Sequence, residues 1–247
     1  MILTIAGREL RSLFLSPLAW AVLAVVQALC AYFFLLYLDL YLQLAPRLAA
    51  VVDGPGVTGI VVAPLFSTAA IVLLLVVPLL TMRLVSEERQ KQTLPLLLSA
   101  PVSMTDIVLG KFVGVFAFVS LMLALIALMP LSLLAGGELD LGLWAAGVLG
   151  MVLIVASFCS IGLLMSTLTA QPVVAAIGSF GVLLLLWVLN IAGDSGNELF
   201  AYLSLLSHYQ PLLRGLVDTA DIAYYLIIIV TCLILSVRRL HADRLQP

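Results

Sequence analysis

The sequence predicts an all-α, polytopic membrane protein, and three observations support this fold class. Hydrophobic residues make up 64% of the 247-residue chain, and the mean hydropathy is +1.27. The apolar residues form six runs, each close to the ~20 residues that a helix needs to cross the hydrocarbon core of a bilayer. None of these runs contains Asp, Glu, Lys, Arg or His. We therefore expect six transmembrane helices within a single transmembrane domain over residues 1–247.

The expected spans lie at about residues 18–38, 63–82, 112–134, 143–168, 173–191 and 222–237. If both termini are cytoplasmic, nine of the eleven basic residues face inward, namely Arg8, Arg11, Arg83, Arg89, Lys91, Lys111, Arg238, Arg239 and Arg244. Arg47 and Arg214 then face outward. Because inner loops of membrane proteins carry an excess of Lys and Arg, this distribution predicts cytoplasmic termini. Nothing in the composition indicates nucleic-acid binding.

Residues 1–16 are expected to form an amphipathic helix that lies along the inner leaflet. Its apolar residues share one side at helical spacing, and they are Ile2, Leu3, Ala6, Leu10, Leu13 and Phe14. Arg8 and Arg11 lie on the other side, where they would approach anionic lipid headgroups. Pro17 predicts a bend between this interfacial helix and the first span.

The inner connector between the second and third spans, residues 83–111, is the most informative loop. A charged helical stretch through Gln92 runs into a leucine-rich stretch up to Leu98. Ser99-Ala100-Pro101 then ends it, and Ser103 with Asp106 has the spacing of a helix start. A bland surface loop needs no exposed leucines. The pattern predicts a helix on the cytoplasmic surface that docks a soluble partner, with Glu87, Glu88, Arg89, Thr93, Leu94, Leu96, Leu97 and Leu98 as its contact residues.

Two outer segments differ in character. Residues 39–60 contain Pro46, Gly54, Pro55 and Gly56 and are expected to be a turn-rich connector. Residues 194–221 are too apolar for a free loop, so we expect two short re-entrant helices, separated at Pro211 and buried against the bundle before the last span. The polar residues of this region that could contact a substrate or stabilise a helix end are His208, Tyr209, Arg214, Asp218 and Asp221.

The connector resembles the permease subunit of type-2 ABC exporters. The matching residues are Glu87-Glu88-Arg89, Thr93-Leu94, the leucine run, the stop at Pro101 and Ile107 to Phe112. The interfacial helix, the six spans and the two outer helices match the same family along the whole chain. A finer similarity, to the permease of gliding-motility ABC exporters, rests on residues 203–225, with Ser207-His208, Arg214-Gly215 and Asp218-x-x-Asp221 before Tyr224-Tyr225.

The resemblance implies a half-transporter in the bacterial inner membrane. Residues 87–98 would be the coupling helix, which fits into a groove of a cytoplasmic ABC ATPase present in two copies. A second copy of this chain or a related permease would complete the path, and a periplasmic auxiliary subunit stays open. ATP and Mg²⁺ would bind to the ATPase. In this chain Thr105 and Phe112 occupy key P-loop positions around Gly110-Lys111, so we expect no nucleotide site, catalytic residue or metal site.

Two other classes of protein were weighed against this interpretation. A channel or secondary transporter that works without an ATPase would need charges or a polar file inside the spans, and Gln27 and Asn190 are sparse for that role. An intramembrane protease would need a base within reach of Ser179, and the two histidines lie at 208 and 241, outside the expected spans. Gly110-x-x-x-Gly114 and Gly162 with Ser166 offer close helix contacts, either between permeases or within one bundle.

Overall fold

A computed structural model shows the arrangement of the chain and describes residues 1–48, 56–93, 103–135, 139–193 and 202–245. The described residues form helices and short connections, with no strand among them. The helices are α1 (Ile2–Leu15), α2 (Pro17–Leu48), the π-helical η1 (Thr58–Val62), α3 (Ala63–Thr81), α4 (Ser86–Gln90), α6 (Met104–Leu131), the 3₁₀ turn η2 (Ser132–Ala135), α7 (Leu141–Leu168), α8 (Pro172–Gly193), α10 (Leu205–Leu213) and α11 (Thr219–Leu245).

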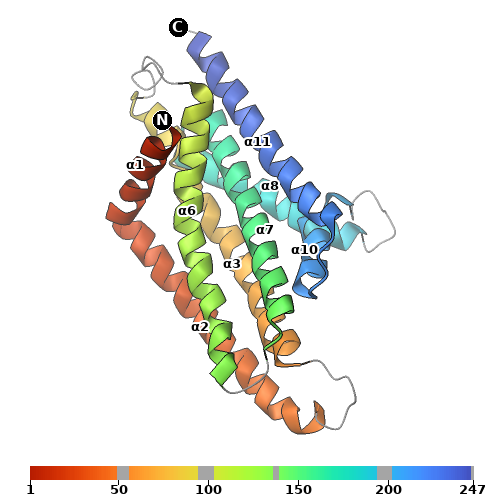
Figure 1. Ribbon diagram of the computed structural model, residues 1–247. Helices are drawn as coiled ribbons and strands as arrows, with labels where there is room; N and C mark the ends of the chain where they lie inside the picture. The colour runs from red at the N-terminus through yellow and green to blue at the C-terminus, as the bar shows by residue number, and fades with distance from the viewer. Residues whose placement is uncertain (49–55, 94–102, 136–138, 194–201, 246–247) are drawn as a thin grey trace.

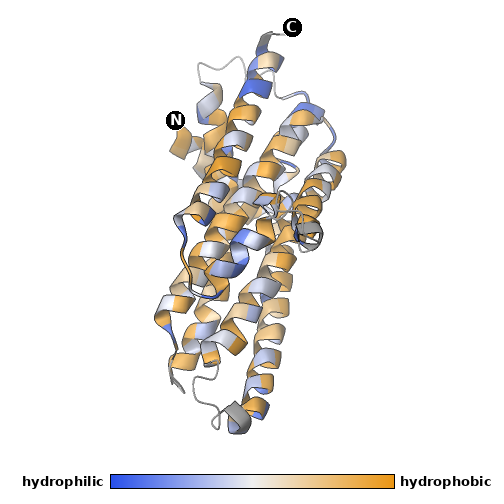
Figure 2. Ribbon diagram, turned by 90° about the vertical axis from the view of Figure 1, so that its right-hand side faces the viewer, coloured by the Kyte–Doolittle hydropathy of each residue, from blue (hydrophilic) through white to orange (hydrophobic). Residues whose placement is uncertain are grey.

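Within the residues that the structure describes, six helical stretches are long and apolar enough to cross a membrane, as the sequence predicted. They are Pro17–Pro46, Thr58–Gln90, Met104–Leu134, Leu141–Leu168, Pro172–Asn190 and Thr219–Arg244. Each expected span falls within one of these stretches to within one residue. Hydrophobic colour dominates along the bundle in Figure 2, with hydrophilic colour near the C-terminus. The chain is an all-helical, multi-pass membrane protein.

Helix α7 forms the centre of the bundle, and α2 lies at its edge (Figure 1). In the most apolar window of α7, 67% of the residues are buried, against 11% for α2. α7 contacts α3, α6, α8, α10 and α11. The lipid or another chain must therefore cover most of α2, whereas α7 is packed by its own chain.

The amino-terminal helix is separate from the first span, as Pro17 predicted. α1 ends at Leu15, and Ser16 adopts an extended conformation before α2 begins at Pro17. Both chain termini lie at the same end of the bundle in Figure 1. That end also holds α4 and the first turns of α6, so the basic residues of these segments gather on one side.

Two expectations about the outer segments are wrong. The first span continues to Leu48 instead of ending at residue 38, because its leucines and Gln43 are good helix formers and Pro46 falls in the last turn. Pro211 lies inside α10 and does not separate two helices. Ser204 caps α10 by accepting from the amides of Leu206 and Ser207, so the helix begins before His208, and only two of its residues follow Pro211.

Candidate functional site at the end of the bundle that holds both termini

Helix α1 packs against a pair of glycines on α6. A Cβ at Gly110 would lie 2.7 Å from the Cβ of Ile5, and a Cβ at Gly114 would lie 2.8 Å from the Cβ of Glu9. Any side chain there would push α1 away from α6. The Gly110-x-x-x-Gly114 pattern therefore packs two helices of one chain, which is one of the two alternatives left open by the sequence.

A buried cation lies at this crossing. Lys111 is 1% exposed, and its Nζ donates to Glu9 Oε1 at 2.9 Å and to Glu88 Oε1 at 2.8 Å. Arg8 Nη2 also donates to Glu88 Oε1 at 3.1 Å. The triad of Lys111, Glu9 and Glu88 joins α6, α1 and α4. Removing one member of such a cluster leaves an uncompensated buried charge, which is strongly destabilising.

The short helix α4 ends earlier than the sequence predicted. Gln92 has φ 56°, its amide donates to the carbonyl of Arg89, and the amide of Thr93 donates to the carbonyl of Glu88. These two bonds are a Schellman cap, which ends the helix at Gln90. A single helix from residue 87 to 98 is therefore not formed, because a non-glycine residue adopts the left-handed conformation at 92.

Polar bonds attach α4 to the centre of the bundle. Ser166 Oγ of α7 accepts from the amides of Val85 and Ser86 at 3.0 and 3.1 Å and donates to the carbonyl of Met82 at 3.0 Å. Arg89 donates to the carbonyl of Thr167 at 2.9 Å and forms an ion pair with Asp243 of α11. The residues 82–85 between α3 and α4 are consequently fixed to α7, and α4 is fixed to α11.

Close packing continues this attachment one turn deeper. A Cβ at Gly162 of α7 would lie 2.1 Å from Thr81 Oγ1 of α3. Gly162 and Ser166, expected as a small-residue surface, thus serve contacts within the bundle. Together with the triad, these contacts link α4 to α1, α6, α7 and α11.

The sequence-predicted contact residues of the connector are only partly placed. Glu87, Glu88 and Arg89 belong to α4, and Thr93 follows its cap. Glu88 and Arg89 turn toward the bundle, whereas Glu87 pairs with Lys91 at 2.6 Å near the surface. Leu94, Leu96, Leu97 and Leu98 lie outside the described residues. Of the interfacial-helix residues, Arg8 joins the triad, and Arg11 is exposed.

The expected apolar side of α1 needs one correction. Leu3 is 82% exposed, whereas Ala6 is buried and Ile5 packs against the core together with Leu10, Leu13 and Phe14. The helix is rotated so that Ile5 and Glu9 meet the two glycines of α6.

A second polar cluster surrounds His208 of α10. His208 Nδ1 lies 2.6 Å from Asp221 Oδ1 of α11, and Nε2 lies 3.0 Å from the carbonyl of Tyr202. Tyr224 stacks on the imidazole with ring centroids 4.0 Å apart. The carbonyl can only accept, so Nε2 is the donor in that hydrogen bond. The side chains of His208 and Asp221 are both buried, so this pair fastens α10 to α11.

The other outer residues have separate surroundings. Tyr209 is fully buried and donates to the carbonyl of Phe66 at 3.0 Å. Arg214 is exposed at the end of α10, and Asp218 is exposed at the start of α11, where its carboxylate accepts from the amide of Ala220 at 3.0 Å. The five predicted residues thus do not converge on one site. Of these five residues, only His208 and Asp221 form a hydrogen bond with each other.

Sequence reasoning missed the most buried charge. It placed Lys111 in the connector, because the apolar run starts at Phe112. The helix start predicted at Ser103 is confirmed, since Ser103 Oγ accepts from the amide of Asp106 at 3.0 Å and α6 begins at Met104, so Lys111 lies two turns inside the helix. Tyr224 and Tyr225, which follow the Asp218-x-x-Asp221 pattern, are both buried and donate to the carbonyls of Leu203 and Leu205.

These features define a class: a six-span membrane protein whose polar segments at the end that holds both termini are bound to one another and to the central helix. A family model described as ABC-2 family transporter protein matches residues 3–243. The chain therefore belongs to the ABC-2 transporter family, in which such a chain is the membrane component and not itself the catalyst. Membership implies a cytoplasmic ATPase partner and dimerisation. No curated protein matches the chain in a direct sequence comparison.

Proposed function

We propose that the chain is the permease half of an ATP-driven exporter in a bacterial inner membrane, with both termini in the cytoplasm. The basic residues near α1, α4 and the end of α11 lie at one end of the bundle, which fits the positive-inside rule. The family match supports an ABC permease. The proposal takes the direction of transport to be export and names no substrate class.

The attachment of α4 is the observation that carries the coupling role. α4 has five residues, too few to be stable alone. Three contacts hold it. The amide of Ser86 donates to Ser166 of α7, Arg89 pairs with Asp243 of α11, and Glu88 pairs with Lys111 of α6. A displacement of α4 by a soluble partner would consequently move several spans at once. We assign the ATPase contact to Glu87 through Leu98, with Leu94 to Leu98 supplying its apolar part.

The partners follow from the same proposal. Two copies of an ABC ATPase bind ATP and Mg²⁺, and a second copy of this chain or a related permease completes the transport path. In this orientation the exposed residues beside α10, with Arg214 and Asp218, belong to the opposite side of the membrane and are the place where a periplasmic subunit would bind. The similarity of residues 203–225 to gliding-motility permeases favours that subgroup.

Co-purification tests the central claim. The tagged full chain is extracted from its native membranes in a mild detergent, and the associated proteins are identified by mass spectrometry. A stoichiometric P-loop ATPase is the expected result. A chain that is reproducibly solitary, in a detergent that preserves a control ABC exporter, would refute the proposal and favour a channel or secondary transporter.

A double variant tests the coupling segment. Leu96→Asp with Leu97→Asp should abolish stimulation of the ATPase by the permease while leaving the spans inserted. The matched control is Leu216→Asp with Val217→Asp, since both of these residues are exposed at the opposite end of the bundle. Normal ATPase association and stimulation in the first variant would refute the assignment of the coupling segment.

A further inference from the structure

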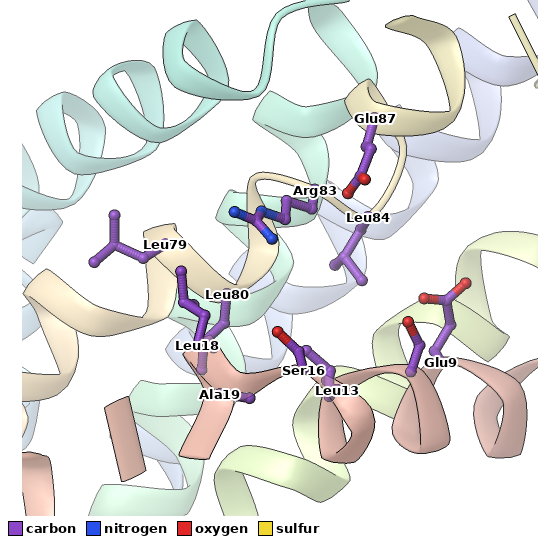
Figure 3. Close-up of a pocket in the computed structure, with 11 residues that line it drawn as sticks. Glu9, Leu13, Ser16, Leu18, Ala19, Leu79, Leu80, Arg83, Leu84 and Glu87 are labelled. Atoms are coloured by element: carbon purple, nitrogen blue, oxygen red, sulfur yellow. The ribbon is translucent and has the colours of Figure 1, made fainter. Parts of the chain in front are cut away.

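A cavity of about 180 Å³ opens where α1, the start of α2 and the end of α3 meet (Figure 3). Its apolar lining residues include Leu18, Leu80 and Leu84, and its polar lining residues include Ser12 and Ser16, of which Ser12 is exposed at the rim. The volume is about six times the ~30 Å³ that one water molecule occupies in the liquid. It is smaller than the ~300–1,000 Å³ of pockets that enclose drug-sized ligands. A small polar group attached to an apolar chain fits such a site.

The charges around this cavity do not balance. Glu9 is paired with Lys111 at 2.9 Å, and Glu87 is paired with Lys91 at 2.6 Å. Arg83 also lines the cavity, and within the described part of the chain it forms no ion pair or side-chain hydrogen bond. Figure 3 shows the Arg83 side chain directed away from Glu87 and toward the part of the cavity that holds Leu18 and Leu79. The carboxylates are already compensated, so the cavity presents an uncompensated guanidinium.

An apolar stripe leads from Arg83 along α3. Ile71, Leu75 and Leu79 are exposed and follow one another at four-residue spacing, which places them on one helix face. Arg83 comes four residues after Leu79, where the chain leaves α3. A cationic end on a hydrophobic stripe matches the shape of a phospholipid, with the phosphate at the cation and an acyl chain along the stripe.

The position of the cavity relative to the bilayer agrees with this ligand. It lies at the junction of α1 and the first span, where Trp20 is exposed and donates to the carbonyl of Phe14 at 2.7 Å. Exposed Trp residues concentrate at membrane–water interfaces, at the level of lipid headgroups. The apolar stripe extends from this level toward the middle of the membrane.

We propose that this cavity binds one phospholipid of the adjacent leaflet. Arg83 binds the phosphate through charge-assisted hydrogen bonds, the strongest kind available to a guanidinium. The hydroxyls of Ser12 and Ser16 supply further donors at the rim, and an acyl chain follows Leu79 and Leu75. The lipid would thereby join α1 to α3 next to the triad of Lys111, Glu9 and Glu88. The site does not depend on the ATPase, so it stands or falls separately from the proposed function.

Native mass spectrometry of the full chain tests the site. The chain is purified in mild detergent without added lipid, and the fraction that retains a phospholipid is measured. Arg83→Gln should lower this fraction about tenfold or more, as expected for the loss of a charged hydrogen-bonding partner. Arg83→Lys should retain part of it. Arg244→Gln is the matched control, because Arg244 is an exposed arginine of the same end that does not line the cavity.

A second variant blocks the cavity without removing the cation. Ser12→Trp places a large ring at the exposed rim and should also abolish lipid retention. Delipidated chain is then titrated with phosphatidylglycerol or phosphatidylethanolamine, and inorganic phosphate in excess should not displace either lipid. Equal lipid retention by Arg83→Gln and Arg244→Gln would overturn the proposal. Displacement of the lipid by inorganic phosphate would also overturn the proposal. So would an Arg83→Gln variant that loses the dimer but keeps the lipid, because a second copy of the chain would then be the occupant of the cavity.

Discussion

Replacing Lys111 by methionine is expected to destabilise the chain strongly. The change leaves Glu9 and Glu88, whose side chains are 14% and 19% exposed, without the ammonium that lies 2.9 and 2.8 Å from them. Removing one partner of a buried ion pair costs about 3–5 kcal/mol. Arg8 stays 3.1 Å from Glu88 and keeps part of the compensation, so we expect the lower end, about 3 kcal/mol.

The assay is thermal unfolding of the purified chain in detergent. For a chain of this size each kcal/mol corresponds to about 2–4 °C in Tm, so Lys111→Met should lower Tm by about 6–12 °C. The triple variant Lys111→Met, Glu9→Gln, Glu88→Gln removes all the stranded charges and should recover most of this loss.

The matched control is Lys91→Met. Lys91 also pairs with a glutamate, Glu87, at 2.6 Å, but its side chain is 66% exposed. Surface pairs of this kind contribute about 0–1 kcal/mol. If Lys111→Met lowered Tm no further than Lys91→Met, or if the triple variant were as unstable as the single one, the reasoning about the triad would be refuted.

Three further predictions concern the contacts between helices. Gly110→Leu should displace α1 from α6 and expose it to proteolysis, because even a Cβ would clash with the chain of α1. Gly162→Ala should lower Tm, since its Cβ would lie 2.1 Å from the Thr81 hydroxyl, and adding Thr81→Ala should restore part of the loss. His208→Phe should loosen α10 and lower Tm, because Asp221 would lose its buried partner at 2.6 Å; adding Asp221→Asn should recover part of the stability.

Each of these predictions has an internal control. Gly7→Leu introduces the same side chain where no atom lies within 4 Å of the added Cβ, so α1 should stay protected. Gly181→Ala likewise meets open space and should leave Tm unchanged. Protease sensitivity equal in Gly110→Leu and Gly7→Leu, or equal Tm values in the two alanine variants, would contradict the packing argument. For the histidine pair, a double variant less stable than His208→Phe would contradict it.

The spans were predictable from sequence because their signal is a sum over about 20 residues. The helix start at Ser103 was also predictable, because the side chain that caps the helix and the amide that it accepts from are only three residues apart in the sequence. Bends and breaks that depend on one residue were less certain. Pro17 separates two helices, whereas Pro211 lies within one, since its neighbours had already begun a helix at the Ser204 cap.

The triad could not be predicted, because it depends on residues that are distant in sequence. Lys111 looks like an ordinary basic residue at a span boundary, and its burial follows only from the seating of α1 on Gly110 and Gly114. Likewise, Glu9 and Glu88 come from separate helices. The leucine run of the connector, in contrast, gave a clear sequence signal, but its residues lie outside the described part of the chain.

The buried charge also explains how α1 keeps one position on α6. Gly110 and Gly114 offer a smooth seat, and a helix on such a seat could slide or rotate at little cost in contact area. Lys111 lies between the two glycines and binds Glu9 from one side and Glu88 from the other. A slide of one helical turn, about 5.4 Å, would break the bond between Lys111 and Glu9, leaving the largely buried Glu9 carboxylate without its ammonium and Lys111 with Glu88 alone. The ion pair therefore fixes the register of α1, and through Glu88 it fixes α4 to the same register.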